Sequence, residues 1–182
     1  AHRAGLPPGV FNVVVGSSTA IGGELTRHPT VRKLTFTGST PVGKQLEAEC
    51  AATLKKTSME LGGNAPFIVF DDADLDAAIQ GAMISKYRNS GQTCVCANRL
   101  LVQEDIAEEF TARLVQAALQ LTLGNGLHDG VQLGPLVNTK AVNDVDDLVQ
   151  RSVAAGAHVA LGGQRSELGP CYYQPTILTG VT

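Results

Sequence analysis

The stretch VRKLTFTGSTPVGKQLEAECAATLKKTSMELGG, residues 31–63, carries the pattern that decides the fold. Residues 31–39 are rich in β-branched and aromatic side chains and end in Gly-Ser, which predicts a strand. Residues 42–54 place apolar side chains near every fourth position, which predicts a helix, and residues 55–63 predict a second strand. Two strands joined by a helix through short connections favour a parallel sheet flanked by helices.

The same alternation of strand and helix continues on both sides of this stretch. The β-branched run VFNVVVG predicts a buried strand at 10–16, and a short helix is expected at 20–28. The pattern restarts after Gly63, and the whole chain predicts an α/β fold with a first domain of residues 1–62 and a second of residues 63–182. In the second domain, strands are expected at 65–70, 99–105, 157–163 and 172–181, and helices at 71–87, 106–121 and 140–156.

Composition excludes several classes of protein. The chain has 182 residues, of which 43% are hydrophobic and 17% charged, so it has enough apolar material for a packed core. Its formal net charge of −3, without a run of like charges, argues against a basic surface for nucleic acid or anionic membranes. No apolar run reaches the length of a membrane-spanning helix, and no leader pattern is present. We therefore expect a protein of the cytoplasm, or of the mitochondrial matrix in a eukaryote.

The FTGS turn has two interpretations. A strand that passes through Gly38 and Ser39 into a helix starting near Pro41 would present free backbone N–H groups to an anion such as a phosphate. The alternative is an ordinary connection between a strand and a helix, without a ligand. Spacing alone does not decide between them, because such turns are common.

Glu60 is a second candidate, because it stands between Met59 and Leu61 in an apolar strand. A carboxylate is costly to bury there, so it either points to solvent or lies in a cleft with a raised pKa as a general base. Residue types alone leave both alternatives open.

The third candidate is RNSGQTCVCANR, residues 88–99, where Cys94 and Cys96 follow a Gly-Gln turn signal. Nearby cations and helix ends can activate a cysteine as a nucleophile, whereas the alternative is a pair of small buried hydrophobic residues. A zinc site is disfavoured, because C-x-C lacks the usual spacing and only His128 or His158 could join it from a distance. A papain-like signature is also missing, and four cysteines do not make a disulfide framework in a chain of this length.

Taken together, four motifs resemble the aldehyde dehydrogenase superfamily, and with the downstream stretches LGPLV (133–137), GAHVALGG (156–163) and YYQPTIL (172–178) the resemblance covers essentially the whole chain. Glu60 of the E-L-G-G strand and Cys94 of the G-Q-x-C motif are 34 residues apart, as the family pattern has them. The resemblance implies an α/β fragment, in which the end of a Rossmann-like parallel sheet domain is followed by the start of the catalytic domain. Within the superfamily the chain is most similar to succinate-semialdehyde dehydrogenases. The motifs are FTGST (36–40), MELGGNAP (59–66), FDDADLDAA (70–78) and RNSGQTCVCANR (88–99).

The resemblance assigns a role to each candidate. Cys94 would attack the aldehyde carbon to form a thiohemiacetal, and its backbone N–H would supply half of an oxyanion hole. After hydride loss, Glu60 would act as the base that activates water to hydrolyse the thioester. A coenzyme-A-acylating relative does not need such a base. Gly38 and Ser39 match the cofactor turn, and Leu61 matches the position beside the nicotinamide carboxamide. The expected cofactor is thus NAD or NADP, between which the chain does not discriminate.

Two further residues receive roles from the same resemblance. Arg88 matches the arginine that holds the distal carboxylate of a semialdehyde, although an arginine there could also be a solvated surface residue. Cys96 could form a reversible disulfide with Cys94 that blocks catalysis, or it could be an inert packed thiol. Another semialdehyde or an aliphatic aldehyde remains an alternative substrate.

Members of the superfamily are longer than this chain, which also begins without Met. We therefore expect a fragment of a homo-oligomeric enzyme that acts on a small-molecule aldehyde, and no turnover by the fragment alone. Two alternatives from other classes are an inactive fragment that serves as a binding or assembly module, and a thiol redox module that uses Cys94 and Cys96. Neither alternative accounts for Glu60 or the FTGS turn.

Overall fold

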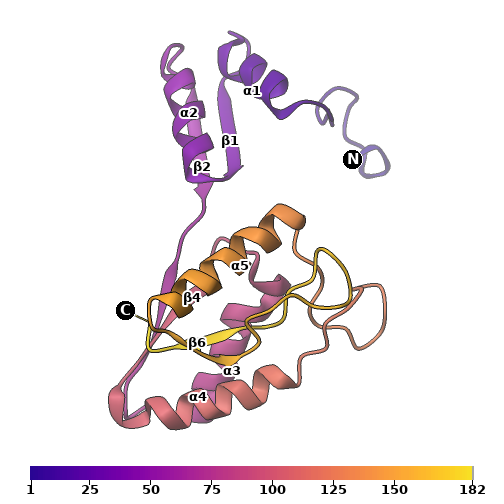
Figure 1. The fold of residues 1–182 in the computed structure, drawn as a ribbon. Helices are drawn as coiled ribbons and strands as arrows, with labels where there is room; N and C mark the ends of the chain where they lie inside the picture. Colours follow the sequence, from indigo (N-terminus) through magenta and orange to yellow (C-terminus); the bar gives the residue numbers. More distant parts are fainter. Residues whose placement is uncertain (182) are drawn as a thin grey trace. The chain divides into compact units, whose positions relative to one another are not determined.

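The computed structural model describes residues 1–181 and divides the chain into two compact units, with the boundary between Gly62 and Gly63. Each unit is built of alternating strands and helices (Figure 1). In unit 1, the elements are η1 (His2–Ala4), α1 (Ser18–Arg27), β1 (Lys33–Gly38), α2 (Thr40–Ala51) and β2 (Lys56–Leu61). In unit 2, they are β3 (Ala65–Val69), α3 (Leu75–Tyr87), η2 (Arg88–Gly91), β4 (Ala97–Val102), α4 (Glu104–Leu119), α5 (Thr139–Ala154), β5 (His158–Leu161) and β6 (Ile177–Thr179).

In unit 1, β1 and β2 form a parallel pair whose register joins Lys33 to Lys56 and Gly38 to Leu61. Parallel neighbours cannot be joined by a hairpin, so the chain between them crosses over through α2. Gly43 of α2 brings the helix close to β2, because a Cβ at this position would lie 2.6 Å from Cδ2 of Leu61. The helix therefore packs directly on the strand that carries Leu61.

Unit 2 repeats this arrangement with β3 and β4, a parallel pair connected through α3 and the residues that follow it. The side chains of β3 alternate as a strand with one covered face requires: Val69 is buried and Ile68 exposed. Phe110 of α4 is 2% exposed and packs with Val69 in the core that α3 and α4 cover. The other buried members of this cluster are Ile79, Ala82 and Leu114.

Near the end of unit 2 the chain is joined to α5 by an apolar cluster that includes Val149 and Tyr173, and by the carboxylate of Asp146. Asp146 accepts hydrogen bonds from Arg165, whose Nε and Nη2 lie 3.0 and 2.9 Å from Oδ2, and from the Tyr173 hydroxyl at 3.1 Å. These bonds hold the pKa of Asp146 below its usual value, chiefly through Arg165, and burial raises the pKa of Tyr173 to about 12. In the same part of the chain, β5 follows α5 and pairs with β6 in an antiparallel arrangement.

The α/β class and the parallel pairing expected from the sequence are confirmed. The strand predicted at 10–16 is wrong: these residues form no strand, and Val15 is 93% exposed. A β-branched run becomes a strand only where another strand accepts its backbone hydrogen bonds, and no described strand pairs with it. The last extended piece, predicted at 172–181, contains strand only at Ile177–Thr179.

Among residues 1–181, no helix combines the length and the apolar character needed to cross a bilayer.

We expect the Asp146 interactions to make the stability of unit 2 depend on pH. A carboxyl whose pKa is lowered in the folded state stabilises the fold above its ordinary value of 3.8, and this contribution is lost as pH falls toward the lower folded pKa. Asp146→Asn should therefore lower the thermal midpoint measured by circular dichroism at pH 6, and the difference from the parent should shrink as pH falls below 3.8.

The matched control is Asp129→Asn, which changes an exposed loop carboxylate that accepts no hydrogen bond within the described residues. The thermal midpoint of Asp129→Asn should stay close to that of the parent at every pH. A midpoint difference for Asp146→Asn that is independent of pH would contradict the assignment.

Candidate functional site

The carboxyl ends of β1 and β2 bring together the cofactor residues expected from the sequence. Gly38 is paired with Leu61 in the parallel register, and Ser39 follows as the residue that precedes α2. A Cβ at Gly38 would lie 2.4 Å from Cζ of Phe36, so a larger residue at this position would require the Phe36 ring to move. The three candidates are therefore neighbours at one edge of unit 1.

The N-terminus of α2 has the features that an anion requires. Ser39 occupies the N-cap position without a side-chain hydrogen bond to the helix, and Pro41 in the first turn has no N–H of its own. The first turn thus leaves backbone N–H groups free at the positive end of the helix dipole. The donors and the close turn at Gly38 fit a dinucleotide phosphate, so the residues present are compatible with NAD or NADP.

Glu60 lies beside Thr37 in the register of the sheet, next to Leu61. Its side chain is exposed in unit 1, which is the first of the two alternatives that the sequence left open. Glu60 accepts no hydrogen bond from the described residues. It is accessible to water, and its role as a base stays a prediction.

Cys94 lies in the turn between η2 and β4 and is an exposed free thiol. Within residues 1–181, no hydrogen bond uses its backbone N–H, which stays available to an oxyanion. Its carbonyl oxygen lies 3.5 Å from the position that a Cβ on Gly63 would occupy, so the chain passes close beside it. The alternative that both thiols are buried is thus wrong for Cys94.

Cys96, in contrast, is 2% exposed and anchored. Its Sγ accepts a hydrogen bond from the Thr93 hydroxyl at 2.9 Å and donates to the Lys86 carbonyl at 3.6 Å. Burial lowers the pKa of Lys86, whose Nζ donates to Oδ1 of Asn98 at 2.6 Å. Cys96 therefore fixes the turn on the side of Cys94 that leads into β4.

The other side of Cys94 is a strained turn. Asn89 (φ 53°), Ser90 (φ 55°) and Gly91 (φ 75°) are three successive residues in the left-handed region. This conformation costs a non-glycine residue roughly 1–2 kcal/mol, so contacts elsewhere must hold the turn in place. Gln92 and Ser90 supply these contacts by hydrogen bonds to the backbone of residues 134–137.

Arg88 begins this turn and is exposed. No ion pair or side-chain hydrogen bond joins its guanidinium to another described residue. Its five donors are therefore free for a carboxylate.

The predicted residues fall into two sets. Gly38, Ser39, Leu61 and Glu60 share one edge of unit 1, and the loop of unit 2 holds Arg88, Cys94 and Cys96.

The sequence does not indicate that Gln92 and Thr93 hold the nucleophile loop, the name used for residues 88–96 around the proposed nucleophile Cys94. The Gly91-Gln92 pair indicates only a turn, and nothing in its spacing indicates which distant segment the Gln92 amide contacts. A run of Asn, Ser and Gly, each of which accommodates unusual backbone conformations or local hydrogen bonds, was the one local sign of the strained turn.

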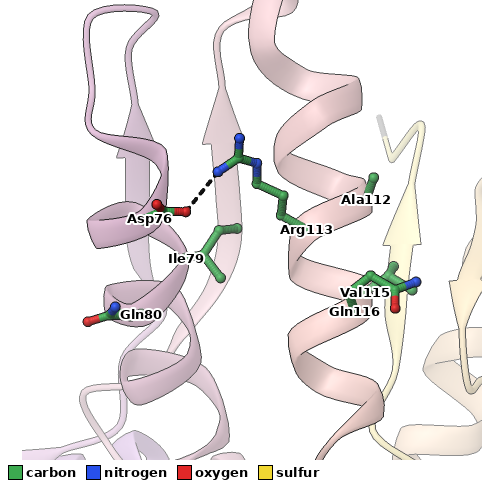
Figure 2. A pocket seen from close by; sticks show the side chains of 7 residues that line it. All are labelled: Asp76, Ile79, Gln80, Ala112, Arg113, Val115 and Gln116. Atoms are coloured by element: carbon green, nitrogen blue, oxygen red, sulfur yellow. Dashed lines mark hydrogen bonds and ion pairs between the residues drawn. The ribbon is translucent and has the colours of Figure 1, made fainter.

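A groove between α3 and α4 is a further hollow of unit 2, and none of the predicted site residues lines it. Figure 2 shows Asp76 of α3 and Arg113 of α4 across it, joined by an ion pair of 2.8 Å. Both ions are exposed, so the pair is a surface bridge between the two helices. Among the described residues, no group of three or more His, Cys, Asp or Glu could hold a metal ion.

Comparisons with known proteins identify the family of the chain. Residues 1–182 match the model of the aldehyde dehydrogenase family. The chain is 59% identical over 181 residues to the glutarate-semialdehyde dehydrogenase of Pseudomonas aeruginosa, covering 100% of this chain and 38% of that protein. It is 56% identical over 181 residues to the succinate-semialdehyde dehydrogenase [NADP(+)] GabD of Escherichia coli, again covering 100% of this chain and 38% of the relative.

Comparison with solved structures indicates the same family. The crystal structure of succinate-semialdehyde dehydrogenase from Burkholderia pseudomallei superposes with a TM-score of 0.97 at 54% sequence identity, covering 100% of this chain and 38% of that one. The chain thus spans about 38% of the length of the curated relatives it matches. The resemblance inferred from the sequence is confirmed, and the chain belongs to the aldehyde dehydrogenase family.

Proposed function

We propose that this chain carries the nucleophile and the water-activating base of an NAD(P)-dependent dehydrogenase for aldehydes that bear a second, negatively charged group. Succinate semialdehyde is the first candidate substrate. The observation that carries the proposal is the exposed Cys94 with an unused backbone N–H, held between anchored neighbours. An accessible thiol beside a free donor is what nucleophilic attack on a carbonyl needs.

Attack of the Cys94 thiolate on the aldehyde carbon forms a thiohemiacetal, whose developing oxyanion the Cys94 N–H stabilises. NAD(P), when bound, supplies the acceptor for the hydride that leaves this carbon. Cys94 then holds the product as a thioester. Splitting the oxidation into covalent steps lowers the barrier of each one.

Glu60 completes the cycle by taking a proton from water, which attacks the thioester and releases the carboxylic acid and the free thiol. Its exposure supports this role, because a base that activates water must be reached by water. Gly38, Ser39 and Leu61 line the side of unit 1 where the cofactor would lie, with the free N–H groups of α2 toward its phosphates.

Arg88 would hold the distal carboxylate of the substrate through two parallel hydrogen bonds. The absence of an ion-pair partner among the described residues supports this role, because an arginine already paired would have to give up that partner. The relatives named above act on semialdehydes of succinate and of glutarate, both of which carry such a carboxylate. Glutarate semialdehyde is accordingly the second candidate substrate.

The assays below use a chimera in which residues 1–182 replace the matching segment of the Escherichia coli relative, because the chain spans 38% of that protein. Formation of NAD(P)H is followed by absorbance. A chimera without activity toward any aldehyde, although it is folded and binds cofactor, would contradict the proposal. The alternatives of an inactive binding module and of a thiol redox module both predict that outcome.

Replacing the nucleophile should abolish turnover. Cys94→Ser should lower kcat at least about a thousandfold, because the thiolate is lost while the loop keeps its shape. Cys171→Ser changes another free thiol of unit 2 and should leave kcat unchanged. Activity that survives in Cys94→Ser would show that a different group attacks the aldehyde.

Replacing the base should separate acylation from hydrolysis. Glu60→Gln should still give a rapid burst of about one NAD(P)H per site, followed by turnover slowed about a hundredfold or more as the thioester accumulates. Mass spectrometry of the quenched protein should find the acyl group on Cys94. The control Glu24→Gln alters an exposed carboxylate of α1 and should show no burst; slow turnover in Glu60→Gln without an acyl-enzyme would contradict the assignment.

Removing the guanidinium should affect charged substrates alone. Arg88→Met should lower kcat/KM for succinate semialdehyde about ten- to a hundredfold, because a pair of charge-assisted hydrogen bonds is lost. Butanal, which lacks the carboxylate, should be oxidised as well as before. Arg151→Met, at an exposed arginine of α5, is the control, and an equal loss with both aldehydes would contradict the substrate role of Arg88.

A further inference from the structure

Gln92 uses both halves of its side-chain amide to join the nucleophile loop to a distant segment. Its Oε1 accepts a hydrogen bond from the Val137 N–H at 2.9 Å, and its Nε2 donates to the Pro135 carbonyl at 3.2 Å. Nε2 also reaches the Asn89 carbonyl at 3.5 Å. One side chain therefore connects the strained turn to residues that follow it by more than 40 positions in the sequence.

The turn is braced at two further points. The Ser90 hydroxyl donates to the Gly134 carbonyl at 3.0 Å, next to the Gln92 contacts. The Asn89 side chain donates to the Gln92 carbonyl at 3.1 Å, and the Gln92 N–H donates to the Asn89 carbonyl at 3.1 Å, so the two residues close the turn between them. Left-handed residues persist only where their surroundings hold them, and these bonds are the ones that do so here.

Cys94 itself makes no side-chain hydrogen bond within the described residues, so its position depends on its neighbours. Cys96 fixes the side toward β4, and Gln92 fixes the other side, two residues before the thiol. We propose that Gln92 is a positioning residue for the nucleophile: its amide holds Cys94 at the place where the thiolate and the Cys94 N–H act together on the aldehyde. This inference rests on the proposed function and extends it to a residue that touches no substrate.

The chemistry of the contact prescribes the variants. Gln92 is exposed, so Gln92→Met removes the hydrogen bonds without opening a cavity. Gln92→Glu has the same shape, but its carboxylate would face the carbonyl oxygens of Pro135 and Asn89, to which it cannot donate. If the side chain merely filled space, the glutamate would be tolerated.

Gln103 provides a matched control in the same unit. Its Oε1 accepts from the Asp71 N–H at 3.0 Å and its Nε2 donates to Oδ2 of Asp71 at 2.8 Å, so it too uses both halves of its amide. It follows β4 directly, whereas Gln92 precedes this strand. Gln103→Met therefore removes a similar pair of hydrogen bonds away from the nucleophile.

In the chimera, Gln92→Met and Gln92→Glu should each lower kcat for succinate semialdehyde about tenfold or more, while KM changes less than about threefold. Gln103→Met should leave both constants near those of the parent. A raised KM with an unchanged kcat, an equal loss in Gln103→Met, or a tolerated glutamate would each overturn the proposal. Should the Gln92 variants fail to fold, Ser90→Ala, which removes the second anchor alone, should lower kcat about two- to fivefold, and an unchanged kcat would overturn it.

A second measurement does not depend on dehydrogenase activity. In the chain of residues 1–182, the rate at which iodoacetamide alkylates Cys94 is compared with the rate in a synthetic peptide of residues 88–99. The alkylation rate of Cys94 in the parent chain should differ from the rate in the peptide at least about threefold. In Gln92→Met the rate should lie closer to that of the peptide, while the alkylation rate of Cys171 should not change. An alkylation rate of Cys94 in Gln92→Met equal to that in the parent would overturn the positioning role, whether or not the chimera is active. An inactive chimera would instead count against the proposed function.

Discussion

Parallel strand pairing is the constraint on which both units depend. Parallel neighbours need a crossover connection, and in each unit candidate site residues lie in or beside that connection. In unit 1, Gly38 ends β1, and the crossover begins with Ser39 and continues as α2, so the end of the strand and the helix N-terminus are adjacent. In unit 2 the crossover from β3 to β4 contains α3 and the loop of Cys94, so the proposed nucleophile is part of the connection that the parallel pairing requires.

The loop of Cys94 shows how a side chain can be exposed and still have a defined position. Within the described residues the thiol makes no hydrogen bond, so its position depends on the residues on either side, one of them buried and the others bonded to backbone. The backbone pays for this with three successive left-handed residues. Strain of this kind often lies at functional sites, where it is held by interactions that the rest of the fold supplies.

Much of this organisation can be read from the sequence, because it depends on local signals. The apolar periodicity of 31–63 predicts the first parallel pair, and the joint presence of Glu60 and Cys94 in their motifs predicts the family. The contacts of Gln92 could not be predicted, because a side-chain hydrogen bond to a segment more than 40 residues away leaves no local pattern. The strand expected at 10–16 failed for a related reason: β propensity describes what a segment can do, whereas pairing depends on a partner elsewhere.

Residues 10–15 have a consequence for how the chain behaves in solution. The run VFNVVV contains no charge and no proline, and five of its six side chains are large apolar groups that are exposed. Short uncharged segments of high β propensity are those that stack into cross-β fibrils when copies of a chain meet. Residues 10–15 are thus a segment through which copies of this chain can associate at high concentration, and Val14→Lys would interrupt the uncharged run at a position far in sequence from the loop of Cys94.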